Sequence, residues 1–170
     1  MIKVRKIAMQ FCLSSAVLAA MPAAFAVEVT PATQHYMVKS LNIGDLPVKT
    51  IVPITAVTAE QAIAQAQVIA SNPNADVAEF RIDLLEFSAD TKKVILLGQQ
   101  LNQILQEKPL IATIRTHNEG GKMTVSDQDY EKIYREYLKK PFMQLLDIEM
   151  FRNAGSVAKL TKLAHDKKVL

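Results

Sequence analysis

Short apolar segments alternate with amphipathic segments from Lys49 onward, and this alternation constrains the fold more than any other feature of the chain. Period-2 patterns predict strands over residues 50–54, 76–82, 110–115 and 145–150. Helical patterns that follow these strands predict helices over 59–70, 91–106 and 154–165, and a further helix after Ser126. The βα units repeat every 30–35 residues, roughly, which is an ordinary length for such units. Repetition of this kind predicts a parallel sheet with right-handed crossovers.

Start and stop signals mark the predicted helices. Thr58 followed by Gln61 is the pattern of a capping box, and Ser126 is a cap residue for the third helix. The first helix is expected to end at residues 71–74 and the second at Lys108-Pro109. Core packing against the sheet is expected for the apolar side of the third helix, which consists of Tyr130, Ile133, Tyr134 and Tyr137.

Two architectures satisfy this pattern, an open doubly wound sheet and half of an eight-stranded barrel. A dinucleotide-binding doubly wound fold needs a glycine-rich turn after its first strand. Residues 54–58 contain no glycine, which argues against a nucleotide site of that kind. Residues 168–170 have the pattern of a fifth strand as it begins. The pattern therefore predicts an α/β fold with about four βα units that reaches the start of strand five, and both architectures remain open.

Charged side chains occupy positions in two predicted strands where a buried sheet would be apolar. Alternation places Glu79 and Arg81 on one face of the second strand, and Thr113 and Arg115 on one face of the third. Burial of such charges is costly unless they are paired or bind a ligand. Because ligands of α/β proteins bind at the C-terminal ends of the strands, these residues are candidates for a binding site.

The first 26 residues have the three-part pattern of a secretory signal peptide. A basic segment over residues 3–6 precedes an apolar run over 7–21, and Ala24-Phe25-Ala26 is a small-x-small cleavage site. The alternative, a membrane anchor, would need about 20 apolar residues, and this run is shorter and interrupted. We therefore expect cleavage before Val27, a periplasmic or secreted protein, and no membrane association after cleavage.

Removal of this segment changes the charge and cysteine arguments. The chain has 20 Lys and Arg against 17 Asp and Glu, and three of the bases lie in residues 1–26, so residues 27–170 are formally neutral. With no basic stripe interleaved with aromatic residues, nucleic-acid binding is not expected. The single cysteine, Cys12, lies in the signal, so thiol chemistry and cysteine metal sites are excluded from the rest, and no cofactor or metal is predicted. The predicted organisation is a signal peptide over 1–26, a lead-in over 27–47 and an α/β domain over 48–170.

At the charged strands and their neighbours, the chain resembles type I 3-dehydroquinate dehydratase. The resemblance rests on an ordered set of segments: Val38–Leu41, Ile43-Gly44, Ile51–Ile54, Glu79–Asp83, Pro109–Thr116, Glu119–Gly121 and Leu146–Phe151. Each segment is weak alone, but their order and spacing are specific. The resemblance implies that residues 48–170 are the first half of a (βα)8 TIM barrel, with about four βα units and a break at the start of strand five. It also implies the reversible dehydration of 3-dehydroquinate to 3-dehydroshikimate through a lysine Schiff base.

The resemblance also implies roles for the charged residues. The substrate carries a carboxylate and several hydroxyl groups. Arg115 is expected to engage it from the third strand, because a guanidinium fork fits carboxylate and hydroxyl oxygens. Glu79 and Arg81 are expected to bind substrate hydroxyls as acceptor and donor, the alternative being that they pair with neighbours at the barrel rim. Glu119 matches the position that orients the catalytic histidine in the family.

The remaining charged residues are expected to support the site, and the two groups that perform the family's chemistry have no match in this chain. Asp147 and Glu149, on one face of the fourth strand, are expected to support the site through hydrogen bonds rather than to contact substrate. The family's general-base histidine lies on its fifth strand and its Schiff-base lysine on its sixth, and no residue of this chain matches either one. His165 is expected at the end of the fourth helix instead, near the helix carbonyls.

Three interpretations remain open at this point. In the first, the chain is part of an exported dehydratase of quinate catabolism, which at full length would be a homodimer. In the second, it is a catalytically inactive half-barrel remnant, or a chain that needs a partner to complete the site. In the third, it is an unrelated βα-barrel enzyme such as another Schiff-base aldolase.

Overall fold

The computed structural model describes residues 34–170, and the predicted signal peptide over 1–26 lies outside these residues. The strands are β1 (Tyr36–Val38), β2 (Leu41–Ile43), β3 (Ile51–Ile54), β4 (Val77–Arg81), β5 (Leu110–Thr113) and β6 (Leu145–Asp147). The helices are α1 (Ala59–Ser71), α2 (Thr91–Leu105), α3 (Asp127–Lys139) and α4 (Ala154–Asp166). Two short 3-10 helices, Ile82–Leu84 and His117–Glu119, follow β4 and β5.

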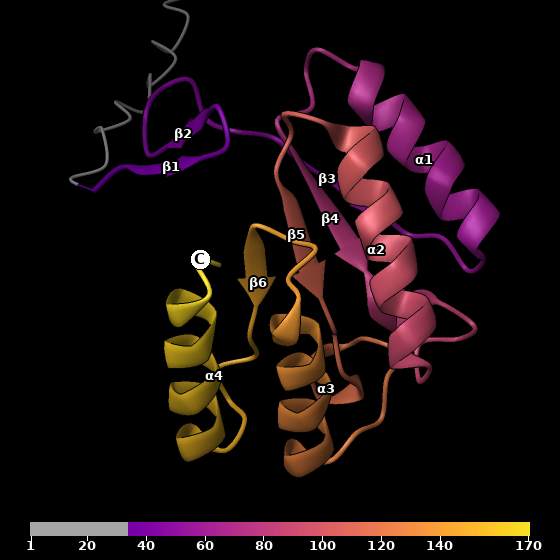
Figure 1. The fold of residues 1–170 in the computed structure, drawn as a ribbon, viewed down its shortest axis with the longest axis vertical. Coiled ribbons are helices and arrows are strands. Elements are labelled where there is room, and N and C mark those ends of the chain that lie inside the picture. The colour runs from indigo at the N-terminus through magenta and orange to yellow at the C-terminus, as the bar shows by residue number, and fades with distance from the viewer. Residues whose placement is uncertain (1–33) are drawn as a thin grey trace, which may run out of the picture. The chain divides into compact units, whose positions relative to one another are not determined.

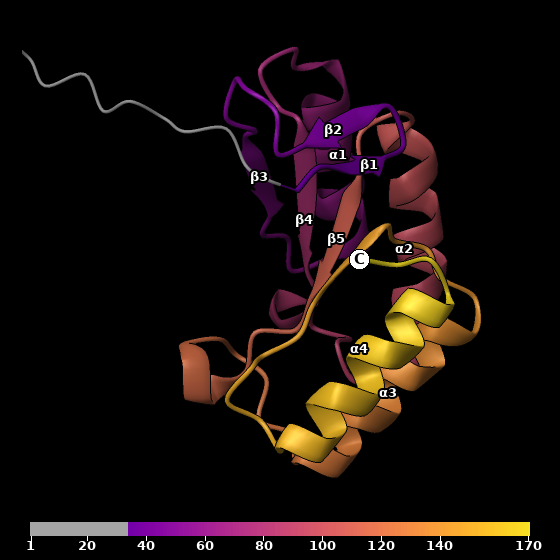
Figure 2. The same ribbon diagram turned by 90° about the vertical axis from the view of Figure 1, so that its left-hand side faces the viewer.

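Strands β3, β4, β5 and β6 form a parallel sheet in chain order, and a helix follows each of them. The register pairs Ile54 with Phe80 and Phe80 with Ala112, so these side chains point to one face of the sheet. The four helices lie along that face, as the two views in Figures 1 and 2 show. The predicted α/β architecture with four βα units is therefore confirmed.

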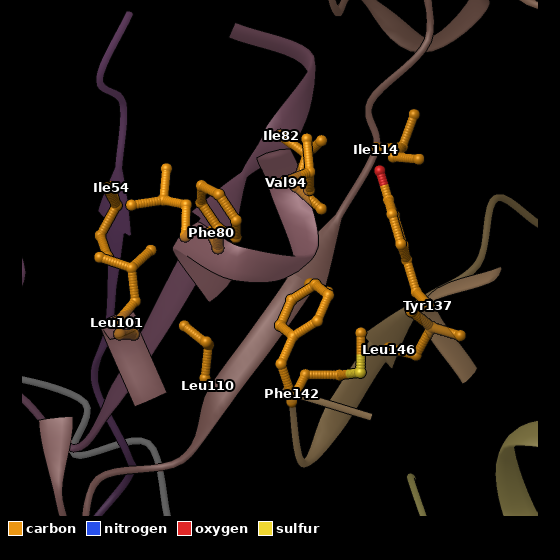
Figure 3. Packing of buried hydrophobic residues seen from close by; sticks show 14 of the residues in the cluster. Ile54, Phe80, Ile82, Val94, Leu101, Leu110, Ile114, Tyr137, Phe142 and Leu146 are labelled. Atoms are coloured by element: carbon orange, nitrogen blue, oxygen red, sulfur yellow. The ribbon is translucent and has the colours of Figure 1, made fainter. Parts of the chain in front are cut away.

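The hydrophobic core lies between the sheet and the helices. Phe80 of β4 is fully buried, and its ring meets that of Phe142 edge to face with centroids 6.4 Å apart (Figure 3). Helix α2 packs closely on this pair because Gly98 has no side chain, and a Cβ there would lie 2.3 Å from the Phe142 ring. The aromatic side of α3 packs into the same core as predicted, and its buried members are Tyr130, Tyr134 and Tyr137.

Local signals set the ends of the helices. Both halves of the predicted capping box form between Thr58 and Gln61 at the start of α1. The Ser126 hydroxyl accepts a hydrogen bond from the backbone of Asp129 at 3.1 Å and caps α3, while α2 begins after a cap at Asp90. Within residues 34–170, no helix combines the length and the apolar character that crossing a bilayer requires.

Residues 36–43, inside the segment expected to be a lead-in, form an antiparallel hairpin of β1 and β2 that the sequence analysis missed. Lys39 occupies its turn with a φ of 53°. The Lys39 ammonium donates to Asn102 Oδ1 at 2.9 Å and to the carbonyl oxygens of Gln106 and Lys108 at 2.5 and 3.0 Å. These bonds satisfy carbonyl groups beyond the end of α2, where helical partners are lacking. They hold the hairpin close to the point where β5 begins.

The last residue pairs with the edge of the sheet. The backbone N–H of Leu170 donates to the carbonyl oxygen of Gln144 at 3.1 Å, and the Leu170 carbonyl accepts from the N–H of Leu146 at 2.8 Å. This is how a parallel neighbour of β6 bonds. The expected start of a fifth strand over 168–170 is therefore visible as backbone pairing at Leu170, although the segment is too short to form a regular strand.

Candidate functional site

The sheet face that the helices leave uncovered carries the charged residues of the strands. The register pairs Arg81 with Thr113 and Thr113 with Asp147, so these three residues form one row across β4, β5 and β6. Glu79 lies in the preceding row, beside Ile111. Side chains paired in a parallel register point the same way. The structure thus brings together residues far apart in the sequence at the C-terminal ends of three neighbouring strands.

Arg81 makes a two-pronged ion pair with Asp83, two residues further along the chain. Its Nε donates to Asp83 Oδ1 at 2.8 Å and its Nη2 to Oδ2 at 2.9 Å. Burial acts to raise the pKa of Asp83, but the hydrogen bonds from Arg81 and from the Lys122 backbone outweigh it and hold the pKa below its ordinary value. A depressed carboxyl pKa means that these bonds stabilise the fold at neutral pH. Their contribution is lost as the pH falls below the ordinary aspartate value of 3.8.

Arg115 lies just beyond this row and reaches two carboxylates. One side of its guanidinium bonds to Glu119 in the following loop, and Nη2 bonds to Asp147 of β6. Burial raises the pKa of Asp147, Arg115 opposes the rise, and the nearby Glu79 and Glu119 add to it. The Arg115 side chain is 27% exposed, so part of it is accessible although its guanidinium is paired. An incoming oxygen ligand would therefore join or replace carboxylates that already surround it.

A second buried carboxylate, that of Glu149 just after β6, holds the chain at Thr116, beyond the end of β5. Its Oε1 accepts from the backbone N–H of Thr116 at 2.6 Å, and its Oε2 accepts from the Thr116 hydroxyl at 2.8 Å. Arg152 donates from Nε to Glu149 at 3.1 Å and from Nη1 to Asp127 at 2.7 Å. Because Thr116 follows Arg115 directly, this network fixes the backbone from which Arg115 projects.

Two tyrosine hydroxyls of α3 replace the strand ladder where β5 and β6 separate. The Tyr134 hydroxyl accepts from the N–H of Ile114 at 2.9 Å and donates to the carbonyl oxygen of Asp147 at 2.8 Å. The Tyr130 hydroxyl accepts from the N–H of Glu149 at 3.1 Å, and burial raises the pKa of Tyr130 to about 12, so it stays protonated. The predicted strand ends were therefore wrong, since β5 and β6 stop two and three residues earlier than expected.

The loop that contains Gly120 and Gly121 folds back on the end of β5. The backbone N–H of Lys122 donates to Asp83 Oδ2 at 3.1 Å. Gly121 packs so closely on the backbone of Arg115 that a Cβ at Gly121 would lie 1.9 Å from the Arg115 carbonyl oxygen. Since the same loop carries Glu119, its position determines how that carboxylate meets Arg115.

The structure answers some questions that the sequence left open about these residues. Glu119, expected to orient a histidine, is paired with Arg115. Arg81 pairs with its neighbour Asp83, as the alternative interpretation required. The Glu79 carboxylate accepts no hydrogen bond from the residues that the structure describes. Sequence reasoning missed Asp83 as the partner of Arg81. The available signal was an acidic residue two positions after an arginine at the end of a strand.

His165 lies exposed in the last turn of α4, as expected from the sequence. Within residues 34–170, no three side chains of the metal-binding types are grouped so as to hold an ion. What the described residues bring together at the C-terminal ends of the strands is a set of guanidiniums and carboxylates suited to binding polar oxygens.

Comparison with known families matches residues 50–170 to the family described as type I 3-dehydroquinase. A catabolic 3-dehydroquinate dehydratase of Acinetobacter baylyi is 75% identical over 148 residues, which are 86% of this chain and 54% of that relative. A 3-dehydroquinate dehydratase of Enterococcus faecalis is 42% identical over 117 residues, which are 69% of this chain and 46% of the relative. The chain thus spans about half the length of the curated relatives it matches.

Solved structures give the same result for the fold. The 3-dehydroquinate dehydratase of Enterococcus faecalis aligns with a TM-score of 0.75 at 38% identity, over 79% of this chain and 55% of that one. A type I 3-dehydroquinate dehydratase of Clostridium difficile, which contains covalently modified comenic acid, aligns with a TM-score of 0.76 at 26% identity, over 80% and 53%. The family match covers the whole parallel sheet and its helices without interruption. The chain therefore belongs to the type I 3-dehydroquinase family.

Proposed function

We propose that this chain supplies a substrate-binding part of a 3-dehydroquinate dehydratase, which removes water from 3-dehydroquinate to give 3-dehydroshikimate. One observation carries the proposal: Arg81 ends β4, Arg115 lies just beyond the end of the neighbouring parallel strand β5, and the Asp83 carboxylate bonds to both residues. Membership of the family and the names of the relatives support this substrate. They also remove the alternative of an unrelated βα-barrel aldolase.

The charge balance of the site favours recognition of the substrate's hydroxyl groups. The two guanidiniums share this region with four carboxylates, which belong to Glu79, Asp83, Glu119 and Asp147. With this negative excess, capture of the substrate's carboxylate by Arg115 alone is less favourable than hydrogen bonding to its hydroxyls. In this arrangement Glu79 accepts from a hydroxyl, and Arg81 and Arg115 donate. Positive charge for the carboxylate would come from the part of the family that this chain does not cover.

The proposed chemistry also draws on that other part. A lysine amine would attack the ketone of 3-dehydroquinate and form an imine, and a histidine would remove the proton that is lost with the hydroxyl group. The covalently modified ligand in the Clostridium difficile relative supports a covalent route for the family. In this division of labour, residues 34–170 bind and orient the ring, and they leave the bond-making groups to the remaining strands.

Complementation between two chains tests the function. This chain is mixed with the part of the Acinetobacter baylyi relative that it does not cover, and formation of 3-dehydroshikimate is followed. The mixture is expected to catalyse dehydration. Arg115→Met should lower kcat/KM about 10- to 100-fold, because a hydrogen bond from a charged group contributes roughly 1.5–3 kcal/mol. Arg135→Met, on an exposed side of α3, is the matched control and should leave the rate unchanged.

The Acinetobacter baylyi relative, split at the same position, is the positive control. If its two parts restore activity together but this chain supports none, the proposal is wrong and the catalytically inactive half-barrel remnant becomes the better account. If this chain catalyses dehydration alone, the expectation that the base and the lysine lie elsewhere is wrong.

We also propose that residues 1–26 are a cleaved signal peptide and that the protein acts in quinate catabolism in the periplasm or outside the cell. The sequence pattern supports export, and the catabolic role named for the Acinetobacter baylyi relative supports the pathway. The protein is recovered from the periplasm and its intact mass is measured. The mass is expected to correspond to a chain that begins at Val27. A protein that keeps Met1 and remains with the cytoplasmic fraction would contradict export.

A further inference from the structure

We propose that Asp83 is a positioning residue that sets both arginines of the candidate site and the loop beside them. The inference rests on the proposed function, because it concerns how the same site is held in order. Asp83 lies in the short 3-10 helix Ile82–Leu84 directly after β4, and its side chain is 0% exposed. It contributes no surface to a ligand, so any effect on binding must pass through its neighbours.

The Asp83 carboxylate joins three separate segments of the chain. Oδ1 accepts from Arg81 Nε at 2.8 Å and from the backbone N–H of Arg115 at 3.4 Å. Oδ2 accepts from Arg81 Nη2 at 2.9 Å and from the backbone N–H of Lys122 at 3.1 Å. An ionised carboxylate has about four acceptor positions, and all of them are used here. One buried group thus fixes the plane of one guanidinium and the backbone of the next strand and loop.

The loop transmits this constraint to the second guanidinium. Lys122, held by Asp83, follows Gly121, which lies directly against the Arg115 carbonyl. The same loop carries Glu119, one of the two carboxylates bonded to Arg115. If Lys122 is released, Glu119 moves with the loop and Arg115 turns toward Asp147. Both arginines would then lose the geometry in which their donors face the uncovered side of the sheet.

Asp83→Asn separates this role from simple packing. The amide is almost the same size as the carboxylate, but it offers one acceptor oxygen and two N–H donors. Those donors would face the Arg81 guanidinium or the Lys122 N–H, so the bonds on one side of the group cannot form. The variant should keep the fold while it frees one guanidinium prong and the loop.

The first test uses the full chain without substrate. In Asp83→Asn, the Lys122 amide should exchange with solvent about tenfold faster, since it loses its acceptor, and the Arg81 Nε signal should move toward that of an exposed arginine. Asp76→Asn is the matched control, because Asp76 precedes β4 at the other end of the sheet and also accepts from a backbone N–H, that of Thr50 at 2.7 Å. That control should leave the Lys122 and Arg81 signals in place.

The second test uses the complemented enzyme and 3-dehydroquinate. Asp83→Asn is expected to raise KM about tenfold or more with a smaller change in kcat, whereas Asp76→Asn should leave both unchanged. Arg81→Lys keeps the charge but loses the fork. If Asp83 acts through Arg81, the double variant Asp83→Asn/Arg81→Lys should be hardly worse than either single variant.

The two tests also separate this inference from the proposed function. A wild-type mixture without dehydratase activity would remove the proposed function, and the exchange and Arg81 signals would then decide the positioning role. Unchanged Lys122 exchange and an unchanged Arg81 signal in Asp83→Asn would overturn the inference. So would a freed loop with an unchanged KM, because Asp83 would then be a structural contact only.

Discussion

Replacement of Arg152 by methionine is expected to lower the free energy of unfolding of the chain by about 3–5 kcal/mol, because it leaves a buried carboxylate without its cation. The Arg152 side chain is 6% exposed and that of Glu149 is 2% exposed. Arg152 also pairs with Asp127, and its guanidinium carbon lies 4.6 Å from the centre of the Tyr130 ring. Methionine keeps part of the packing and removes all of these charge contacts. Urea unfolding followed by circular dichroism measures the loss.

Two further variants show whether the lost charge is the cause. Arg135→Met removes an ion pair with Glu131 on the same helix, but Arg135 is 43% exposed, so the cost should stay below about 1 kcal/mol. Arg152→Lys keeps a cation near Glu149 without the planar fork and should fall between wild type and methionine. Equal losses for Arg152→Met and Arg135→Met would show that the buried network around Glu149 adds nothing to stability.

Gly121→Ala is expected to cost about 3 kcal/mol or more and to detach the loop from the end of β5. The added Cβ would lie 1.9 Å from the Arg115 carbonyl oxygen and 2.3 Å from its carbonyl carbon, which are rigid backbone atoms. The backbone must therefore separate, and the bond from Lys122 to Asp83 breaks with it. Urea unfolding measures the cost, and amide exchange at Lys122 reports the detachment.

The neighbouring glycine is the control for this substitution. Gly120 has a φ of 83° with open space around its Cβ position, so alanine there suffers only the strain of the left-handed region, about 1–2 kcal/mol. Gly120→Asn should cost less, because asparagine tolerates that conformation. A loss at Gly121→Ala no larger than that at Gly120→Ala would contradict the close approach of the loop to Arg115.

The parallel sheet could be predicted because local sequence patterns mark its strands and helices. Alternation marked the strands, and caps such as Thr58 and Ser126 marked the helix starts. The ends of β5 and β6 could not be predicted, because they depend on tyrosine hydroxyls that arrive from another helix. The hairpin of β1 and β2 was missed because its strands are only three residues long and Lys39 holds it through distant carbonyl groups.

The candidate site was predictable in its members but not in its pairings. Alternation placed Glu79 and Arg81 on one face of the second predicted strand and Arg115 on one face of the third, and the parallel pairing of β4 with β5 brought these faces together. The choice of Asp83 as the partner of Arg81 depends on the turn of the 3-10 helix after β4, which folds the carboxylate back onto the arginine. Likewise, the pairing of Glu119 with Arg115 depends on how closely the glycine loop folds back.

Borohydride trapping of the complemented enzyme tests most directly whether this chain binds substrate without providing the nucleophile. Borohydride reduces an imine between a lysine and the substrate to a stable secondary amine, so the added mass identifies the chain that carries the lysine. With 3-dehydroquinate, the adduct is predicted on the Acinetobacter baylyi part alone, and its yield should fall when this chain carries Arg115→Met. An adduct on a lysine of this chain, or a yield unaffected by Arg115→Met, would contradict that division of roles.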